Sequence, residues 1–319
     1  MPFKRTILLG IVGDSAAGKS TLSAGIAKIL GEERVTVICT DDYHRYNRKQ
    51  RKELGISALD PACNYINIME QHLDLLRRGH PILKPIYNHS TGDFDPPEYI
   101  EPREFIIAEG LLGFYSQALR RQFDVKVYLA PEEDLRIQWK IARDTTKRGY
   151  TPEQVLASLK KRQRDSERFI HPQQAHADIV VTFYRPPDHP QATDSHLNVK
   201  LKLRPTLPHP NLADIVAWNN NKRVFSSSIE REDDWLMEIL DIKGEINDEQ
   251  ATQLEDLIWE RVDKFSSAGK HLRPDQIGVY TSGNETHISH PLGITQLLIV
   301  YQLMLAREEL EKERASRIF

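Results

Sequence analysis

The chain of 319 residues is poor in cysteine, and its only two, Cys39 and Cys63, exclude a disulfide framework. No apolar run approaches the length that spans a bilayer, and the run at 7–12 is too short for the core of a signal peptide. The 43 Lys and Arg residues are balanced by 46 Asp and Glu residues, so no positive field favours nucleic acid or an anionic membrane. We therefore expect a cytoplasmic protein that binds neither.

Residues 13–21 match the phosphate-binding loop pattern G-x-x-x-x-G-K-[ST], placed between an apolar run and a segment with helical spacing. Glycines let successive backbone N–H groups face one concavity, and the helix N-terminus adds its positive dipole end. We expect Lys19 to reach the outer phosphates of a nucleotide and the Ser20 hydroxyl to bind Mg²⁺; the alternative is an ordinary glycine-containing turn. The predicted nucleotide-binding residues are Gly13, Asp14, Ser15, Ala16, Ala17, Gly18, Lys19, Ser20 and Thr21.

Apolar runs alternate with helical patterns over the first two thirds of the chain, which predicts an α/β fold with a largely parallel sheet flanked by helices. Added C-terminal strands, the first at 197–203, would make the sheet mixed. The expected strands are 6–12, 35–39, 105–108, 125–129 and 179–183, and the expected helices are 20–30, 69–78, 113–121, 132–143, 153–167, 249–264 and 292–315. Segment 80–103, rich in proline and polar residues, predicts an ordered binding loop.

Three carboxylates follow predicted strands, where parallel sheets bind ligands. Of the adjacent pair Asp41 and Asp42, one can serve catalysis while the other caps a helix or pairs with a cation. Glu109 ends a buried apolar strand, where a carboxylate is costly unless it meets a metal or a cation. Glu109 is therefore the candidate Mg²⁺ ligand, and a structural salt bridge is the alternative.

Segment 140–153 places four cations and one carboxylate near a helix end, before Gly149 breaks the helix and Thr151-Pro152 starts another. This segment matches the phosphoribulokinase signature K-[LIVM]-x-R-D-x-x-x-R-G-x-[ST]-x-E. The chain further resembles the plant and cyanobacterial branch of that family at the phosphate loop and at 41–44, 48–52, 58–61, 84–89 and 109–111. The resemblance is dense from residue 6 to about 185.

The resemblance implies a P-loop kinase domain over 1–319, with a nucleotide- and substrate-binding core and lid at 1–185 and an extension at 186–319 packed on the same sheet. It implies the Calvin-cycle reaction in which ATP and Mg²⁺ phosphorylate the 1-hydroxyl of D-ribulose 5-phosphate to ribulose 1,5-bisphosphate, and it suggests a homodimer. The implied catalytic residues are Asp41 as the base, Lys19 and Asp144. The implied substrate-binding residues are His44, Arg48, Arg51, Tyr87, His89, Lys140, Arg143 and Arg148, of which His44 and Arg48 match positions that bind the substrate phosphate.

The sequence departs from the photosynthetic branch of this family at two places. Ala17 replaces the first regulatory cysteine, so no disulfide with Cys39 can form, and the C-terminal cysteine pair is missing. We therefore expect no thioredoxin-type switching and do not carry over the complex with glyceraldehyde-3-phosphate dehydrogenase. Leu112-Gly113 replaces the family's histidine-containing pair, which leaves the acceptor open.

Two alternative functions remain open. One is a paralogous kinase for another sugar phosphate or for a nucleoside such as uridine. The other is a nucleotide-binding regulatory protein that has lost catalysis. Cations at His44 and Arg48 favour a phosphorylated acceptor over a nucleoside.

Overall fold

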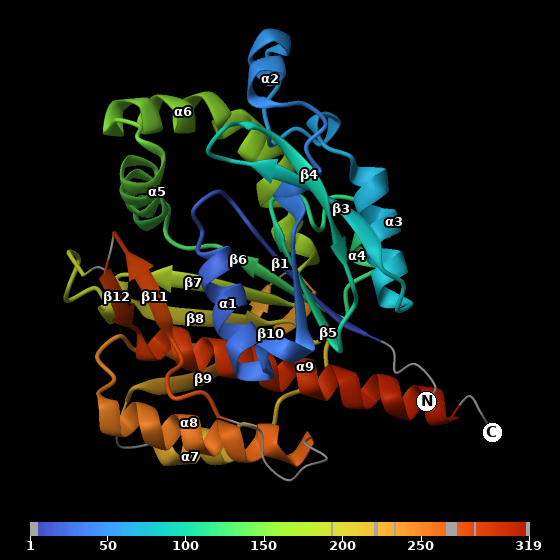
Figure 1. Cartoon of the computed structure of the whole chain (residues 1–319). Helices are drawn as coiled ribbons and strands as arrows, with labels where there is room; N and C mark the ends of the chain where they lie inside the picture. Colours follow the sequence, from blue (N-terminus) through green and yellow to red (C-terminus); the bar gives the residue numbers. More distant parts are fainter. Residues whose placement is uncertain are drawn as a thin grey trace. The chain divides into compact units, whose positions relative to one another are not determined.

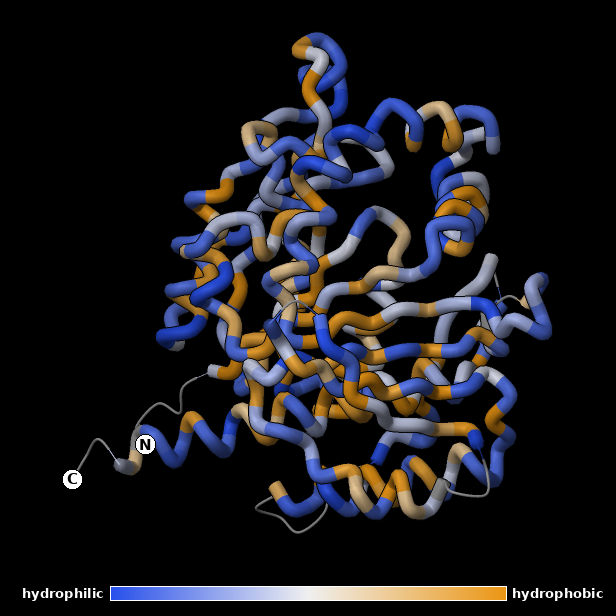
Figure 2. Tube along the Cα trace, turned by 180° about the vertical axis from the view of Figure 1, so that it is seen from behind, coloured by the Kyte–Doolittle hydropathy of each residue, from blue (hydrophilic) through white to orange (hydrophobic). Residues whose placement is uncertain are grey.

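The computed structural model describes residues 6–192, 194–219, 223–232, 234–265, 273–283 and 285–316. The chain forms two compact units, each with its own set of strands (Figure 1). The first unit comprises Met1–Lys19, Glu33–Leu129 and Arg136–Ala177, and the second comprises Ser20–Glu32, Ala130–Leu135 and Asp178–Phe319. In both units hydrophobic residues gather along the strands, which form the core (Figure 2).

The first unit is built on parallel strands in the order β2 (Val35–Cys39), β5 (Phe105–Gly110), β1 (Ile7–Gly13) and β6 (Val125–Leu129). Every residue of β1 and β5 is buried, as expected for central strands of a parallel sheet covered on both faces. Because the strands are parallel, their carboxyl ends meet at one edge. The phosphate loop and the turns that carry the candidate carboxylates start there.

Helices of the first unit begin at local capping signals. Asn47 and Gln50 form a capping box at α2, and Thr151 and Gln154 form another at α6, with Pro152 at the first helical position. A π turn (Ser166–Ile170) and a 3₁₀ turn (His171–His176) follow α6. The helices are α2 (Arg48–Leu54), α3 (Ile66–Arg77), α4 (Gln117–Arg120), α5 (Glu133–Arg148) and α6 (Pro152–Asp165).

Segment 80–103, predicted as a loop, is instead an antiparallel hairpin of β3 (Ile82–Asn88) and β4 (Asp93–Ile100). The prolines that suggested a loop are tolerated for a local reason. Pro85 lies at a register shift between Lys84 and Ile86, and β4 is exposed along almost its whole length. Proline removes a hydrogen-bond donor, which costs little at a bulge or in an exposed strand.

The second unit pairs its strands antiparallel in the order β7 (Ile179–Tyr184), β8 (Asn198–Leu203), β10 (Trp235–Ile242) and β9 (Phe225–Glu232). The helix α9 packs on α8 and β8, and its buried Gln296 accepts a hydrogen bond from Gly278 N at 3.0 Å. The remaining elements are α1 (Lys19–Leu30), α7 (Ala213–Asn219), α8 (Asp248–Val262), α9 (His290–Ser316) and the hairpin β11 (Val279–Ser282) with β12 (Glu285–Ile288).

The predicted α/β fold, with a largely parallel sheet flanked by helices and with added C-terminal strands, is confirmed. Two helix bounds were wrong. The helix predicted at 113–121 is only α4, because the Ser116 side chain caps Leu119 N. The helix predicted to end at 143 continues to Arg148, so all four cations of segment 140–148 are helical and the break occurs only at Gly149, where φ is +69°. How segment 186–319 packs on the sheet of 1–185 stays a prediction.

None of the described helices is both long enough and apolar enough to cross a membrane.

We predict that Gly10→Ala lowers the free energy of unfolding by about 1–3 kcal/mol, the usual cost of overpacking a core. A Cβ at Gly10 would lie 2.6 Å from Phe114 Cε1 and 2.9 Å from Phe123 Cδ1, two buried rings that already pack edge to face. Denaturant unfolding of the two proteins measures the difference. Val37→Thr, at the one exposed position of β2, is the control and should change stability by no more than about 0.5 kcal/mol. Equal stability of Gly10→Ala and wild type would contradict the packing argument.

Candidate active site

The phosphate loop wraps around the ammonium group of Lys19. Lys19 Nζ donates to the carbonyl oxygens of Gly13 and Asp14, both at 3.0 Å, and the side chain is buried. The loop turns through positive φ at Ala16 (68°) and at Gly18 (94°). Ser20 and Thr21 follow in the first turn of α1. These contacts give the loop the curved backbone that a phosphate-binding nest requires.

Asp14 is buried within the loop and binds groups that come from distant parts of the sequence. Its carboxylate accepts hydrogen bonds from Ser15 N at 2.5 Å and from Ser166 Oγ. His171 Nε2 and Arg136 Nη1 each lie 3.7 Å from it. Burial alone would raise the pKa of Asp14, but the nearby His171 side chain and the charge of Arg136 hold it well below its usual range. The carboxylate therefore stays ionised and anchors the loop.

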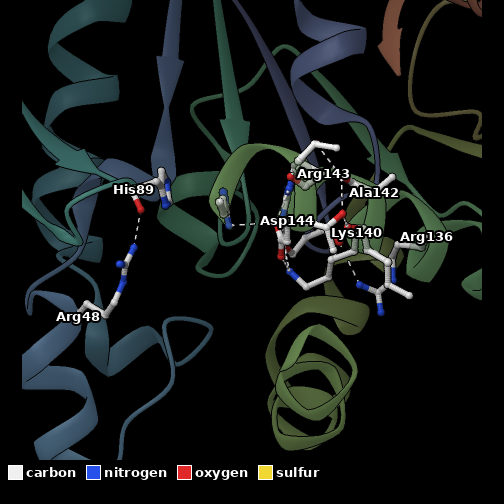
Figure 3. A network of polar contacts seen from close by, with 12 residues as sticks. Arg48, His89, Arg136, Lys140, Ala142, Arg143 and Asp144 are labelled. Atoms are coloured by element: carbon white, nitrogen blue, oxygen red, sulfur yellow. Dashed lines mark hydrogen bonds and ion pairs between the residues drawn. The ribbon is translucent and has the colours of Figure 1, made fainter. Parts of the chain in front are cut away.

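One face of α5 turns its cations toward Ser15. Arg136, Lys140 and Arg143 are spaced four and three residues apart, so they share a helix face. Arg136 Nη1 donates to Ser15 O at 3.0 Å. Lys140 Nζ and Arg143 Nη2 donate to Ser15 Oγ at 3.1 and 3.3 Å (Figure 3). The cations of the predicted lid are thus attached directly to the phosphate loop.

Asp144 is surrounded by the same cations. Its carboxylate lies 3.1 Å from Lys140 Nζ, 2.8 Å from Arg143 Nε and 3.5 Å from Arg148 Nη1 (Figure 3). Burial raises the pKa of Asp144, but the Arg143 hydrogen bond and the Lys140 charge outweigh it and lower the pKa. Burial lowers the pKa of Lys140 to about 8, although Asp144 opposes the shift. An ionised Asp144 held by three cations is suited to orienting them rather than to accepting a proton.

The adjacent aspartates Asp41 and Asp42 have different surroundings in the turn after β2. Asp42 is buried, forms an ion pair with buried Lys84 and accepts a hydrogen bond from Tyr87 N at 3.1 Å. It therefore joins this turn to the β3–β4 hairpin. Asp41 is half-buried, and its Oδ1 accepts a hydrogen bond from Leu111 N at 2.9 Å. Of the two, Asp41 has the carboxylate that a substrate can reach.

Gly110 allows the close approach that positions Asp41. A Cβ there would lie 2.0 Å from Thr40 Oγ1 and 2.8 Å from Asp41 Oδ1. Buried Gln173 fixes the next residues, because its Nε2 donates to Leu111 O at 2.7 Å and its Oε1 accepts from Phe114 N at 2.8 Å. The segment after β5, whose Leu111 N binds Asp41, is therefore fixed by Asp41 and by Gln173.

Glu109 lies at the end of β5, in register with Cys39 on β2, and is buried. Burial, together with the charges of Asp41 and Glu109, raises the pKa of the Cys39 thiol. A carboxylate and the Ser20 hydroxyl are hard oxygen donors of the kind that Mg²⁺ prefers, and this ion usually keeps several water and phosphate ligands. Within the described ranges no three His, Cys, Asp or Glu residues cluster closely enough to hold a metal on their own. That Ser20 and Glu109 share one metal stays a prediction.

Three of the predicted substrate-binding residues contact the ring of a fourth, Tyr87. The His44 and His89 rings pack edge to face on it, with centroids at 4.7 and 5.0 Å. Arg51 lies over the same ring at 4.8 Å and donates to the Tyr87 hydroxyl at 2.6 Å. Arg48 is exposed, and its guanidinium donates to the backbone oxygens of His89 and Ser90 (Figure 3). These bonds tie Arg48 to the turn between β3 and β4.

Neither cysteine forms a disulfide; Cys63 is buried and Cys39 is half-buried.

Several residues of the site were not predicted from the sequence. Arg136 could have been found, because it continues the helical spacing of Lys140 and Arg143. The others come together only through the fold and carry no motif. They are Asn64, Ser166, His171 and Gln173. Lys84 lies in the segment 84–89 that resembles the family, but its ion pair with Asp42 was not predicted.

A model of the "Phosphoribulokinase / Uridine kinase family" matches residues 8–188. The phosphoribulokinase of Synechocystis sp. is 45% identical over 177 residues, covering 56% of this chain and 53% of that protein. The chloroplastic phosphoribulokinase of Triticum aestivum is 36% identical over 195 residues, covering 56% of this chain and 48% of that protein. The chain thus spans about half the length of these curated relatives. A uridine kinase of Clostridium perfringens is 31% identical over 182 residues, 56% of this chain and 88% of that protein.

Among solved structures, the phosphoribulokinase from Rhodobacter spheroides aligns with a TM-score of 0.57 over 81% of this chain and 98% of that one. The sequence identity is 19%, so this likeness concerns the fold. The family model covers more than half of the chain and includes the phosphate loop, the Asp41 turn and the cationic face of α5. The chain therefore belongs to the phosphoribulokinase / uridine kinase family.

Proposed function

We propose that this protein is an ATP- and Mg²⁺-dependent kinase that phosphorylates the 1-hydroxyl of D-ribulose 5-phosphate to ribulose 1,5-bisphosphate. The single observation that carries the proposal is the reachable carboxylate of Asp41 in the same unit as the Lys19 loop and the cationic face of α5. The relatives from Synechocystis and wheat are phosphoribulokinases and support this acceptor.

In this proposal Asp41 accepts the proton of the attacking hydroxyl as the phosphoryl group is transferred. Lys19, Lys140 and Arg143 face the phosphates and stabilise the charge that spreads over the transferred group. Ser20 and Glu109 would hold Mg²⁺, which when bound neutralises charge on the outer phosphates. Asp144 keeps the cations in place and does not itself exchange a proton. A homodimer in the cytoplasm is part of the proposal.

The uridine kinase alternative is supported by the relative from Clostridium perfringens, of which the chain covers the larger share. The charges around Tyr87 argue against it. Arg51 contacts this ring, and the pKa of nearby His89 is lowered by partial burial and then by the charges of Arg148 and Arg143. Several guanidinium groups close to the acceptor-binding residues suit a phosphorylated acceptor better than a nucleoside.

Parallel assays of ATP turnover with ribulose 5-phosphate, ribose 5-phosphate and uridine test the proposal. We expect ribulose 5-phosphate to give the highest kcat/KM. A preference for uridine would favour the nucleoside kinase. ATP binding without transfer to any of the three would favour the regulatory protein that has lost catalysis.

We predict that replacement by asparagine affects catalysis at Asp41 and stability at Asp42. Asp41→Asn should lower kcat by about 10²–10⁴, the usual contribution of a general base, with stability unchanged because Asn Oδ1 can still accept from Leu111 N. Asp42→Asn should lower stability by about 3–5 kcal/mol, because it leaves buried Lys84 unpaired. Steady-state kinetics and denaturant unfolding separate the effects. Wild-type kcat in Asp41→Asn would refute its role as the base.

We predict that kcat/KM falls as pH rises through about 8, the pKa to which burial lowers Lys140. The charged form binds phosphate, so activity is present below this pKa and lost above it. Lys140→Arg stays charged and should move the alkaline limb to higher pH. The matched control is Lys160→Arg on α6, an exposed lysine whose replacement should leave the limb in place. An unmoved limb in Lys140→Arg would assign the titration to another group.

A further inference from the structure

The orientation of the Asn64 amide is fixed by its own partners. Asn64 Nδ2 lies 3.1 Å from Ala58 O and 2.9 Å from Asp60 O. Both are carbonyl oxygens, which only accept, so the amide nitrogen must face them. The other amide atom, Oδ1, therefore faces His44 Nδ1 at 2.7 Å.

This orientation determines where the imidazole of His44 carries its proton. Asn64 Oδ1 has no hydrogen, so Nδ1 of His44 must donate. In the neutral ring, Nε2 then has a lone pair and no hydrogen. The backbone holds the two side chains together, because residues 44 and 64 form an antiparallel bridge flanked by the bonds Arg45 N to Cys63 O and Tyr65 N to Tyr43 O, both 2.8 Å.

The surroundings of His44 favour the neutral ring. His44 is 4% exposed, and burial is the main cause that lowers its pKa. Asp41 and the hydrogen bond to Asn64 oppose this shift, whereas the charges of Arg51 and His89 add to it. Within the described part of the chain, the ring makes no hydrogen bond other than that to Asn64.

We propose that neutral His44 accepts, through Nε2, a hydrogen bond from a hydroxyl group of the acceptor sugar, and that Asn64 is the positioning residue that imposes this tautomer. The inference rests on the proposed sugar-phosphate kinase function and deepens it. It gives His44 a partner different from the substrate phosphate that the family resemblance implies.

A phosphate group does not suit this ring. Its outer oxygens are acceptors, so a bare Nε2 would meet them lone pair to lone pair. The guanidinium groups of Arg51, Arg143 and Arg148 are permanent donors in the same unit. A sugar hydroxyl, by contrast, supplies the hydrogen that Nε2 lacks. A site that must hydrogen-bond a hydroxyl discriminates strongly against an acceptor without it, so His44 would help to select the sugar.

Asn64→Asp loses the donor to Ala58 O and Asp60 O, so denaturant unfolding must first show that its stability is close to that of wild type. In that folded variant the two readings of the tautomer predict opposite effects. A carboxylate at Nδ1 raises the pKa of His44 and stabilises the imidazolium, whose Nε2 donates. We expect kcat/KM for ribulose 5-phosphate at neutral pH to fall by about tenfold, the equivalent of one lost hydrogen bond, with KM for ATP unchanged. If His44 bound the phosphate, the imidazolium would raise kcat/KM instead. An unchanged or higher kcat/KM overturns the proposal.

Asn47→Asp is the matched control. It makes the same change three residues from His44, at the exposed cap of α2, where aspartate caps equally well and Asn47 makes no bond to His44. Like Asn64→Asp it removes an amide donor, here the one at 3.3 Å from Asp93 Oδ1. Its kcat/KM should equal that of wild type. A fall as large as that of Asn64→Asp would attribute the effect to added charge and overturn the inference.

¹⁵N NMR of the His44 ring in the wild-type protein needs neither turnover nor a folded variant. We expect a protonated Nδ1 and a bare Nε2 at neutral pH, and a bare Nε2 that shifts when ribulose 5-phosphate is added without ATP. A protonated Nε2, before or after addition, overturns the inference. Failure of the proposed function is distinguishable, because it shows as absent turnover of ribulose 5-phosphate while the ring signals still report the tautomer.

Discussion

The attachment of the phosphate loop to the cationic face of α5 is the interaction on which the rest of the site depends. Ser15 accepts hydrogen bonds from Lys140 and Arg143 through its hydroxyl and from Arg136 through its carbonyl. The neighbouring carboxylate of Asp14 is ionised and held by the segment after α6. The shape of the phosphate loop and the positions of the α5 cations therefore depend on each other. A shift of either would move the donors away from the phosphates, and electrostatic stabilisation depends steeply on such placement.

The turn after β2 solves a second problem with two neighbouring carboxylates. A base must be reachable by the substrate, yet the turn that carries it must be rigid. Asp42 provides the rigidity through the buried ion pair with Lys84, and Asp41 keeps the reachable position. Neither carboxylate could fill both roles. A buried, paired carboxylate does not readily accept a proton, and a carboxylate on an unanchored turn is poorly placed.

The sequence predicts local structure and contiguous motifs well, and long-range contacts poorly. Burial on both faces makes β1 and β5 continuous apolar runs, and capping residues mark α6, so these elements were predictable. The β3–β4 hairpin was not, because its prolines hide the strand pattern. In the site, the lid signature identified Lys140 and Asp144. Asn64 and Ser166 were missed, since only the fold brings them to His44 and Asp14.

A site rich in cations must still tell one acceptor from another. Guanidinium and ammonium groups attract any phosphate, and their long-range attraction depends little on the sugar to which it is attached. Discrimination therefore needs a neutral, directional group that reads hydroxyls. The buried imidazole of His44, with its donor nitrogen already used by Asn64, is such a group among the residues around Tyr87. Charge would then bind the phosphates, while a single uncharged acceptor atom would select the sugar, because leaving it unpaired in a buried site is costly.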